Sequence, residues 1–203
     1  MDAESPQSKT RPAETKHTLR SRLIRLRAGL SHDARAEKSR VIADRIEGVA
    51  AFRDAAVVAL YAPLGTEVDS TEIARRLLAR GVRVLFPRAI PGERRLALAR
   101  CEPSELVIGP FGAPEPPASA PRADPEDVAC VVLPGVAFST DGHRLGRGGG
   151  HYDATLAAMP RAARVGVAFD LQLVPSVPCE PHDAALDVLV TEARTLHFER
   201  DSR

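Results

Sequence analysis

Five short apolar runs are the most regular feature of the hydrophobic pattern along this chain. They cover residues 56–61, 82–86, 128–133, 165–169 and 186–190. A run of four to eight apolar residues between turn-forming residues is typical of a strand that is buried on both faces, as in a parallel sheet. We therefore predict five strands in the interior of the protein.

The segments between these runs carry apolar residues at helical spacing. A first helix is predicted from Lys16, where Leu19, Leu23 and Leu26 recur at intervals of four and three. Arginines, Arg27 among them, fall on the other faces of this helix, which we interpret as solvated. Capping residues and apolar periodicity predict further helices within residues 31–49, 69–81 and 152–160.

This alternation of strands and helices predicts an α/β fold in a single domain. We expect three α/β/α layers around a mostly parallel, Rossmann-like sheet, with ligands at the carboxyl ends of the strands. The unit over residues 56–86 predicts a parallel pair with a right-handed crossover, its second strand ending at Pro87. Residues 1–14 are polar and predict a disordered tail, which leaves residues 15–198 as the folded domain.

Prolines are concentrated between residues 102 and 126. This density excludes a core element and indicates an ordered connector. A flexible linker between two domains would have a similar composition, but the apolar runs on either side fit one sheet.

Composition excludes several classes of function. The formal net charge of the 203 residues is +1, so no global field favours nucleic acid or an anionic membrane. The chain contains no apolar run long enough for a membrane span and no signal-peptide pattern. Its three cysteines, 101, 130 and 179, are scattered and odd in number, which favours a reducing compartment, and we expect a cytoplasmic protein.

The basic residues are unusual in kind, because only Lys9, Lys16 and Lys38 are lysines while 25 are arginines. Arginine is therefore this chain's ordinary surface cation, and a lysine beside a motif is informative. A basic helix carrying Arg20 to Arg27 could also bind nucleic acid. The near-neutral net charge and the aromatic content of 4% argue against this, since single strands need an aromatic platform.

The segment from Arg144 to Asp153 contains four glycines and two arginines within its first seven residues. Glycine lets main-chain N–H groups approach an anion closely, and arginine adds a planar donor fork. The spacing fits neither the P-loop nor the dinucleotide fingerprint. From the residues alone, a phosphate cradle is favoured, and a structural glycine turn remains the alternative.

Several side chains around this segment are candidates for binding. Asp153 is either a helix-start residue or a Mg²⁺ ligand, and Asp187, an acid near the start of an apolar run, is a second candidate. Glu67 is either a solvated loop acid or an acceptor for a polar ligand. His151 and Tyr152 could stack on a planar ring, although a tyrosine at helical spacing is as often a core residue.

The segment 133–153, which reads LPGVAFSTDGHRLGRGGGHYD, closely resembles the signature of 5-formyltetrahydrofolate cyclo-ligases, also called 5,10-methenyltetrahydrofolate synthetases. The resemblance extends over nearly the whole chain. Its secondary matches are Lys16-x-x-Leu19-Arg20, Glu67-Val68-Asp69, 84–88, Phe111-Gly112 with Glu115-Pro116, 168–172, and Pro181-His182-Asp183 with Leu186-Asp187.

The resemblance implies an ATP-dependent enzyme that converts 5-formyltetrahydrofolate into 5,10-methenyltetrahydrofolate and releases ADP and phosphate. Arg147 and Lys16 would be catalytic, and Asp153 and Asp187 would hold Mg²⁺. The folate would contact Ala62, Glu67 and Tyr152. ATP would be bound by Lys16, Arg20, Arg144, Leu145, Gly146, Arg147, Gly148, Gly149, Gly150, His151 and Tyr152.

One position departs from the family pattern, which usually has two tyrosines before the aspartate, whereas the first of these is His151 here. Imidazole can still stack or donate a hydrogen bond, so activity is expected. The alternative is a non-catalytic relative that keeps the fold and binds nucleotide or folate. The presence of Lys16, Arg147, Asp153 and Asp187 argues against it, since a non-catalytic relative would be expected to lose some of them. We expect ATP and 5-formyltetrahydrofolate as ligands of a monomer, with no nucleic-acid or membrane partner.

Overall fold

An eight-stranded sheet forms the centre of the protein, in the order β13-β12-β10-β7-β1-β2-β3-β6. The computed structural model describes residues 14–180 and 183–199. Five neighbouring strands are parallel and coincide with the five predicted runs, namely β12 (Val188–Val190), β10 (Ala163–Val167), β7 (Cys130–Leu133), β1 (Val57–Leu60) and β2 (Arg83–Arg88). Antiparallel strands extend both edges, β13 (Thr195–His197) on one side and β3 (Ala97–Ala99) with β6 (Arg122–Ala123) on the other.

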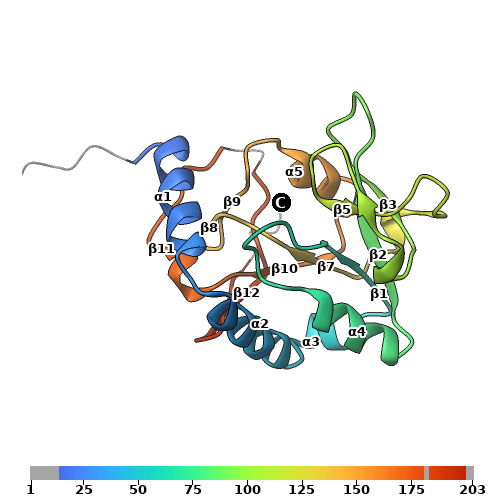
Figure 1. Ribbon diagram of the computed structural model, residues 1–203, viewed down its shortest axis with the longest axis horizontal. Helices are drawn as coiled ribbons and strands as arrows, with labels where there is room; N and C mark the ends of the chain where they lie inside the picture. Colours follow the sequence, from blue (N-terminus) through green and yellow to red (C-terminus); the bar gives the residue numbers. More distant parts are fainter. Residues whose placement is uncertain (1–13, 181–182, 200–203) are drawn as a thin grey trace, which may run out of the picture.

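Helices cover the two faces of this sheet unequally (Figure 1). One face packs against α2 (His32–Ile46), α3 (Ala50–Arg53) and α4 (Thr71–Ala79), which bury residues such as Ile42 and Leu77. The opposite face is covered by the short helix α5 (His151–Leu156), by Met159 and by the loops around Phe138. The predicted single α/β domain with a mostly parallel sheet is confirmed.

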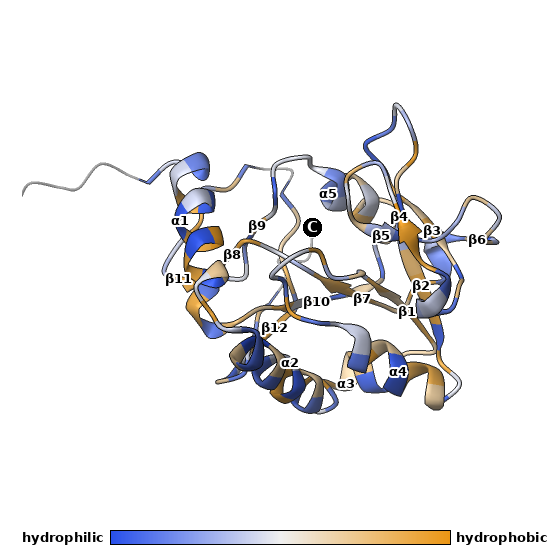
Figure 2. Cartoon of the chain, in the orientation of Figure 1, coloured by the Kyte–Doolittle hydropathy of each residue, from blue (hydrophilic) through white to orange (hydrophobic). Residues whose placement is uncertain are grey.

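The hydropathy pattern explains this layering (Figure 2). The strands β1 and β7 are buried along their whole length, as the continuous apolar runs predict. The helix α2 is hydrophilic on its outer face and buries Ile42, Ala43 and Ile46 against the sheet. Burying each isoleucine or leucine side chain contributes about 1.5–3 kcal/mol, so the apolar stripe fixes which face of the helix meets the sheet.

The strand β2 continues through Pro87 and Arg88, so the prediction that it ends at Pro87 is wrong. Pro87 pairs with Leu98 of β3, whereas the pairing of β2 with β1 stops at Leu85. A proline lacks a backbone donor and is tolerated where one side of a strand has no partner. Because the pairing with β1 has ended, no backbone donor is needed on that side of β2, and Pro87 can belong to the strand.

The proline-rich segment is ordered, as predicted. It forms the two-stranded hairpin of β4 (Val107–Ile108) and β5 (Pro114–Glu115) and then β6, which joins the edge of the main sheet. Two short 3₁₀ helices, Pro103–Glu105 and Pro125–Asp127, flank these strands. The segment is therefore more than a connector, because it supplies an edge strand.

The helix α1 (Lys16–Ala28) lies beside a small sheet of β11 (Leu173–Val174), β8 (Ala137–Ser139) and β9 (Arg144–Leu145). Leu19 and Leu23 pack into a separate core there. The prediction is wrong one turn later, because Leu26 is 50% exposed whereas Arg27 is only 2% exposed. Residues at intervals of four share one face, so Arg27 continues the stripe of Leu19 and Leu23.

Two predictions, the disordered tail and part of the family resemblance, concern residues that the structure does not describe. The predicted disordered tail lies outside the described residues except for Glu14, whose carboxylate accepts hydrogen bonds from Arg22. No helix in the described part of the chain is both long and apolar enough to cross a membrane. Pro181 and His182 of the family resemblance also lie outside the described residues.

Candidate functional site

A cavity of about 700 Å³ opens at the carboxyl ends of the parallel strands. Its walls include Tyr61 and Ala62 after β1, Pro87 at the end of β2, and Pro134 and Gly135 after β7. Loops that follow parallel strands converge at one edge of the sheet, and this is where α/β proteins bind ligands. The cavity therefore lies at the edge of the sheet where the sequence predicts a ligand site.

Most of the predicted site residues line this cavity, although they come from distant parts of the sequence. Those that line it are Lys16, Arg20, Ala62, Glu67, Arg144, Gly146, Arg147, Gly148, Gly149, Gly150, His151, Tyr152 and Asp153. Two predicted residues do not line it, Leu145 and Asp187.

Leu145 is a core residue, so its side chain is not available to a ligand in the cavity, and its predicted contact with ATP stays a prediction. Its side chain is 3% exposed and packs with Leu19 and Leu23 beneath α1. Residues of a strand point to alternate faces, so β9 directs the side chain of Arg144 to the cavity and that of Leu145 to the core.

Asp187 immediately precedes β12, whereas the cavity opens where the parallel strands end. Its Oδ2 accepts a hydrogen bond of 2.7 Å from the backbone N–H of Arg164, next to β12 in the sheet. This contact satisfies an acid in an apolar strand without a metal. Asp187 therefore does not line the cavity together with Asp153, and its role as a metal ligand stays a prediction.

The glycine-rich loop runs along one wall of the cavity, between β9 and α5. Gly148 and Gly150 adopt φ values of +110° and +67°, which side chains rarely allow. A Cβ on Gly149 would lie 2.6 Å from Cδ2 of His151. Arg20 borders the same loop, since its Nε donates a hydrogen bond of 2.8 Å to the Gly146 carbonyl. The main chain of the glycine-rich loop and the side chain of Arg20 together form a wall of N–H donors, which is the kind of surface that the sequence predicted for an anion.

Carboxylates hold two further cations at this wall. Lys16 Nζ lies 2.8 Å from Glu180 Oε1 and 3.1 Å from Asp183 Oδ2. The hydrogen bond that Lys16 donates to Glu180 is the main cause that raises the pKa of Lys16, against the opposing effect of burial, so the amine is positively charged. Arg144 is buried, donates to Asp153 Oδ1 at 3.0 Å, and lies 5.6 Å from the centre of the Tyr152 ring.

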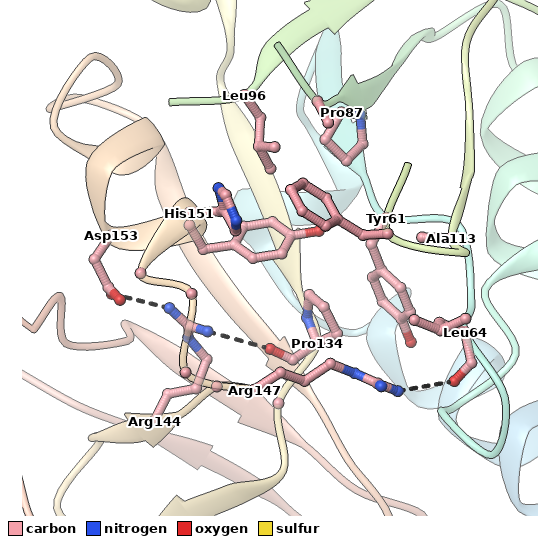
Figure 3. A pocket seen from close by; sticks show the side chains of 18 of the residues that line it. Tyr61, Leu64, Pro87, Leu96, Ala113, Pro134, Arg144, Arg147, His151 and Asp153 are labelled. Atoms are coloured by element: carbon pink, nitrogen blue, oxygen red, sulfur yellow. Dashed lines mark hydrogen bonds and ion pairs between the residues drawn. The ribbon is translucent and has the colours of Figure 1, made fainter. Parts of the chain in front are cut away.

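Arg147 extends across the cavity to the loop after β1 (Figure 3). Its Nε lies 3.1 Å from Glu67 Oε1, and its Nη2 donates to the Leu64 carbonyl at 3.2 Å. The side chain of Glu67 is 8% exposed, and its second oxygen accepts a hydrogen bond from the Leu64 amide. A buried carboxylate and a half-exposed guanidinium therefore face each other across the opening.

Aromatic side chains form the opposite part of the cavity. Burial raises the pKa of the Tyr152 phenol, which stays neutral. Tyr61 donates a 2.6 Å hydrogen bond to the Val68 carbonyl, and its pKa is also raised by burial. His151 Nδ1 lies 2.8 Å from the Arg94 carbonyl, so this nitrogen carries a proton, and the imidazole lies 5.0 Å from the ring of Phe111.

Sequence reasoning did not assign a site role to Tyr61, Phe111 or Glu115, all of which line the cavity. Phe111 and Glu115 belong to the proline-rich segment, and only their part in the family resemblance signalled them. Tyr61 ends a strand run, and an apolar pattern cannot show whether such a residue faces a core or a cavity.

Among the described residues, no group of three or more histidine, cysteine, aspartate or glutamate side chains could hold a metal ion by itself. Asp153 is the predicted metal ligand that lines the cavity. Mg²⁺ commonly takes one or two protein carboxylates and completes its shell with phosphate oxygens and water. A single carboxylate at the cavity is a donor that suits Mg²⁺ when phosphate oxygens and water supply the remaining ligands.

Comparison with known proteins places this geometry in context. A 5-formyltetrahydrofolate cyclo-ligase of Mycolicibacterium smegmatis is 32% identical over 186 residues, which cover 89% of this chain and 95% of that protein. One from Escherichia coli K12 is 33% identical over 147 residues, or 68% of this chain and 78% of its own length.

Solved structures agree with the sequence comparison. The 5,10-methenyltetrahydrofolate synthetase of Aquifex aeolicus has 34% identity and a TM-score of 0.79, covering 93% of this chain and 94% of its own. The one from Mycoplasma pneumoniae has a TM-score of 0.72 at 22% identity, over 87% of this chain and 98% of that one, and shows the shared fold. The family model for these enzymes matches residues 12–192, and the chain therefore belongs to the 5-formyltetrahydrofolate cyclo-ligase family.

Proposed function

We propose that this protein catalyses the ATP-dependent cyclisation of 5-formyltetrahydrofolate to 5,10-methenyltetrahydrofolate, with release of ADP and phosphate. One observation carries the proposal beyond family membership. A single cavity joins a glycine and arginine wall to a wall that contains Tyr61, Phe111 and the carboxylate of Glu67. Its volume lies within the range of about 300–1,000 Å³ that is usual for ligand pockets, so two ligands can meet there.

The chemistry explains why both walls are needed. A formamide oxygen is a poor leaving group, so the formyl oxygen first attacks the γ-phosphorus of ATP and ADP departs. N10 of the folate then attacks the activated formyl carbon, phosphate leaves with the former formyl oxygen, and N10 loses its proton. The protein positions the reactants and neutralises the charge of the transferred phosphoryl group.

The cations of the glycine-rich wall support binding of the triphosphate. Arg20, Arg144 and Lys16 present donors from α1 and β9 at one side, and the open main chain of Gly148 to Gly150 adds N–H groups. Arg147, whose guanidinium is half exposed, can turn from Glu67 to a phosphate oxygen. Lys16 and Arg147 are the proposed catalytic residues.

Asp153 would hold Mg²⁺ together with phosphate oxygens. The ion would neutralise the charge that builds up on the β- and γ-phosphates. Arg144 fixes the Asp153 carboxylate through Oδ1.

Glu67, Ala62 and Tyr152 support binding of the folate. A carboxylate that is 8% exposed at the base of a cavity suits the paired N–H donors of a pterin ring. Tyr152 and Phe111 provide flat apolar surfaces for the rings of the ligand. The three cysteines are free, which supports a reducing, cytoplasmic location.

An absorbance assay for methenyltetrahydrofolate tests this proposal. We expect product from 5-formyltetrahydrofolate only when both ATP and Mg²⁺ are present, with one ADP formed per turnover. The alternative, a non-catalytic relative, predicts binding of ATP or folate by calorimetry without any product. That result at micromolar protein would refute the enzyme proposal.

Gly149→Ala tests whether the glycine-rich loop binds the phosphates of ATP. The added Cβ would lie 2.6 Å from His151 Cδ2 and 2.9 Å from Nε2, so the imidazole or the loop must move. Overpacking of this kind costs about 1–3 kcal/mol, and we expect ATP affinity to fall about tenfold by calorimetry. The matched control is the same change in a His151→Ala background, where the clash is absent. Equal losses in both backgrounds would contradict the steric explanation.

A further inference from the structure

Arg27 is a buried arginine near the end of α1, and the proposed reaction gives it no role. Its side chain points away from solvent on the same helix face as Leu23, and the residue is 2% exposed. A buried guanidinium is expensive unless hydrogen bonds and an opposite charge compensate it. The hydrogen bonds of the Arg27 guanidinium therefore indicate its role.

The Arg27 guanidinium connects two loops that form the cavity. Its Nε lies 3.1 Å from Thr66 Oγ1, in the loop after β1, and its Nη1 donates to the Gly135 carbonyl at 3.2 Å, in the loop after β7. Thr66 precedes Glu67 directly, and Gly135 itself lines the cavity. These contacts fix the base of the cavity on the side where the Glu67 carboxylate lies.

Three charges are arranged in sequence from the core to the opening. Burial is the main cause that lowers the pKa of Arg27, while the negative charge of Glu67 raises it and Arg147 lowers it. Glu67 is 8% exposed, whereas Arg147 is 49% exposed on the solvent side and also bonds Leu64. Arg27 is a buried cation held on the Glu67 loop through Thr66, whereas Arg147 is the half-exposed cation that contacts Glu67 directly.

We propose that Arg27 is a positioning residue for Glu67, which fixes the Glu67 loop through Thr66 and supplies its lasting counter-charge while the folate is bound. The inference rests on the proposed function, because it takes Glu67 as the folate acceptor. Removing Arg27 leaves the phosphate wall of Lys16, Arg20 and Arg144 in place, so the effect is selective for one of the two ligands.

Arg27→Gln tests this role, with Arg25→Gln as the matched control, because Arg25 is an exposed arginine on the same helix. Calorimetry gives the affinity for 5-formyltetrahydrofolate and for ATP separately, and kinetics gives kcat. We expect the 5-formyltetrahydrofolate affinity of Arg27→Gln to fall at least about tenfold, and ATP affinity to change less than about threefold. Arg27→Lys, which keeps the charge, should recover part of the loss. Arg25→Gln should match the wild type.

A double-mutant cycle separates positioning from a general structural effect. In a Glu67→Gln background, Arg27→Gln should cost no further 5-formyltetrahydrofolate affinity beyond about twofold, because the carboxylate that it serves is absent. Additive losses, or equal losses for both ligands, would overturn the inference. If Arg27→Gln fails to fold, Thr66→Val removes the hydroxyl partner alone, and the same selective loss is expected from it.

The outcomes also distinguish this inference from the proposed function. A wild-type protein that binds no 5-formyltetrahydrofolate overturns both. A wild type that binds and turns over, together with an Arg27→Gln variant equal to Arg25→Gln, overturns only the role of Arg27.

Discussion

Arg147→Ala should reduce kcat by about 10³-fold while the fold remains intact. Arginines that stabilise a transferred phosphoryl group are worth factors of this size, because the charge they neutralise grows in the transition state. Arg147 is half exposed and its main contacts are with Glu67 and Leu64, so its loss removes little packing. Single-turnover formation of methenyltetrahydrofolate, followed by absorbance, measures the effect on chemistry directly.

The control for this variant is Arg161→Ala, which removes an arginine whose side chain is 83% exposed and whose nearest carboxylate contact is 3.9 Å long. It should leave kcat within about twofold of the wild type, as exposed ion pairs contribute little. Arg147→Lys keeps the charge without the planar fork and should retain an intermediate rate. A wild-type rate in Arg147→Ala would show that the residue is only a surface cation.

Asp153→Asn should raise the Mg²⁺ concentration needed for half-maximal activity by about tenfold or more. It should also reduce kcat, since an amide is a poor ligand for a hard cation. The same change removes the carboxylate that pairs with Arg144, whose side chain is 3% exposed. The amide oxygen of asparagine can still accept the hydrogen bond from Arg144, but the buried guanidinium loses its counter-charge, which costs about 1–3 kcal/mol, so denaturant unfolding should also show a loss of stability.

Asp54→Asn is the matched control, because Asp54 pairs with Arg53 on the surface with its side chain 65% exposed. It should change neither the Mg²⁺ titration nor the free energy of unfolding by more than about 0.5 kcal/mol. The role of Asp153 as a metal ligand is wrong if the Mg²⁺ titration of its variant follows that of the wild type, even when stability falls.

The parallel strands were predictable because burial on both faces leaves a continuous apolar run that few other structures produce. The additions at the edges of the sheet were not. Pro87 extends β2 only because β1 has ended beside it, and β6 lies in a segment whose prolines argue against any strand. Whether such a segment joins a sheet depends on which backbone N–H and C=O groups the adjacent strand leaves unpaired. The sequence of the segment itself does not contain that information.

The glycine-rich wall of the site was predictable for a similar reason. Glycines and arginines at short spacing have few uses other than anion binding, and all of the segment except Leu145 lines the cavity. Asp187 shows the limit of this reasoning. An acid in an apolar run requires a polar partner, but the sequence does not say whether that partner is a metal or the backbone N–H of Arg164.

The sequence by itself determined the five parallel strands, the edge of the sheet at which the cavity opens, and the family. Each follows from local composition or from a motif with few alternative uses. The tertiary structure decided which charges meet. It buried Arg27 where the pattern indicated a solvated face, brought Glu67 to Arg147 across 80 positions, and left Asp187 outside the cavity that Asp153 lines. The reason is physical, because the environment of a charge is set by side chains distant in the sequence that folding brings to the same edge of the sheet.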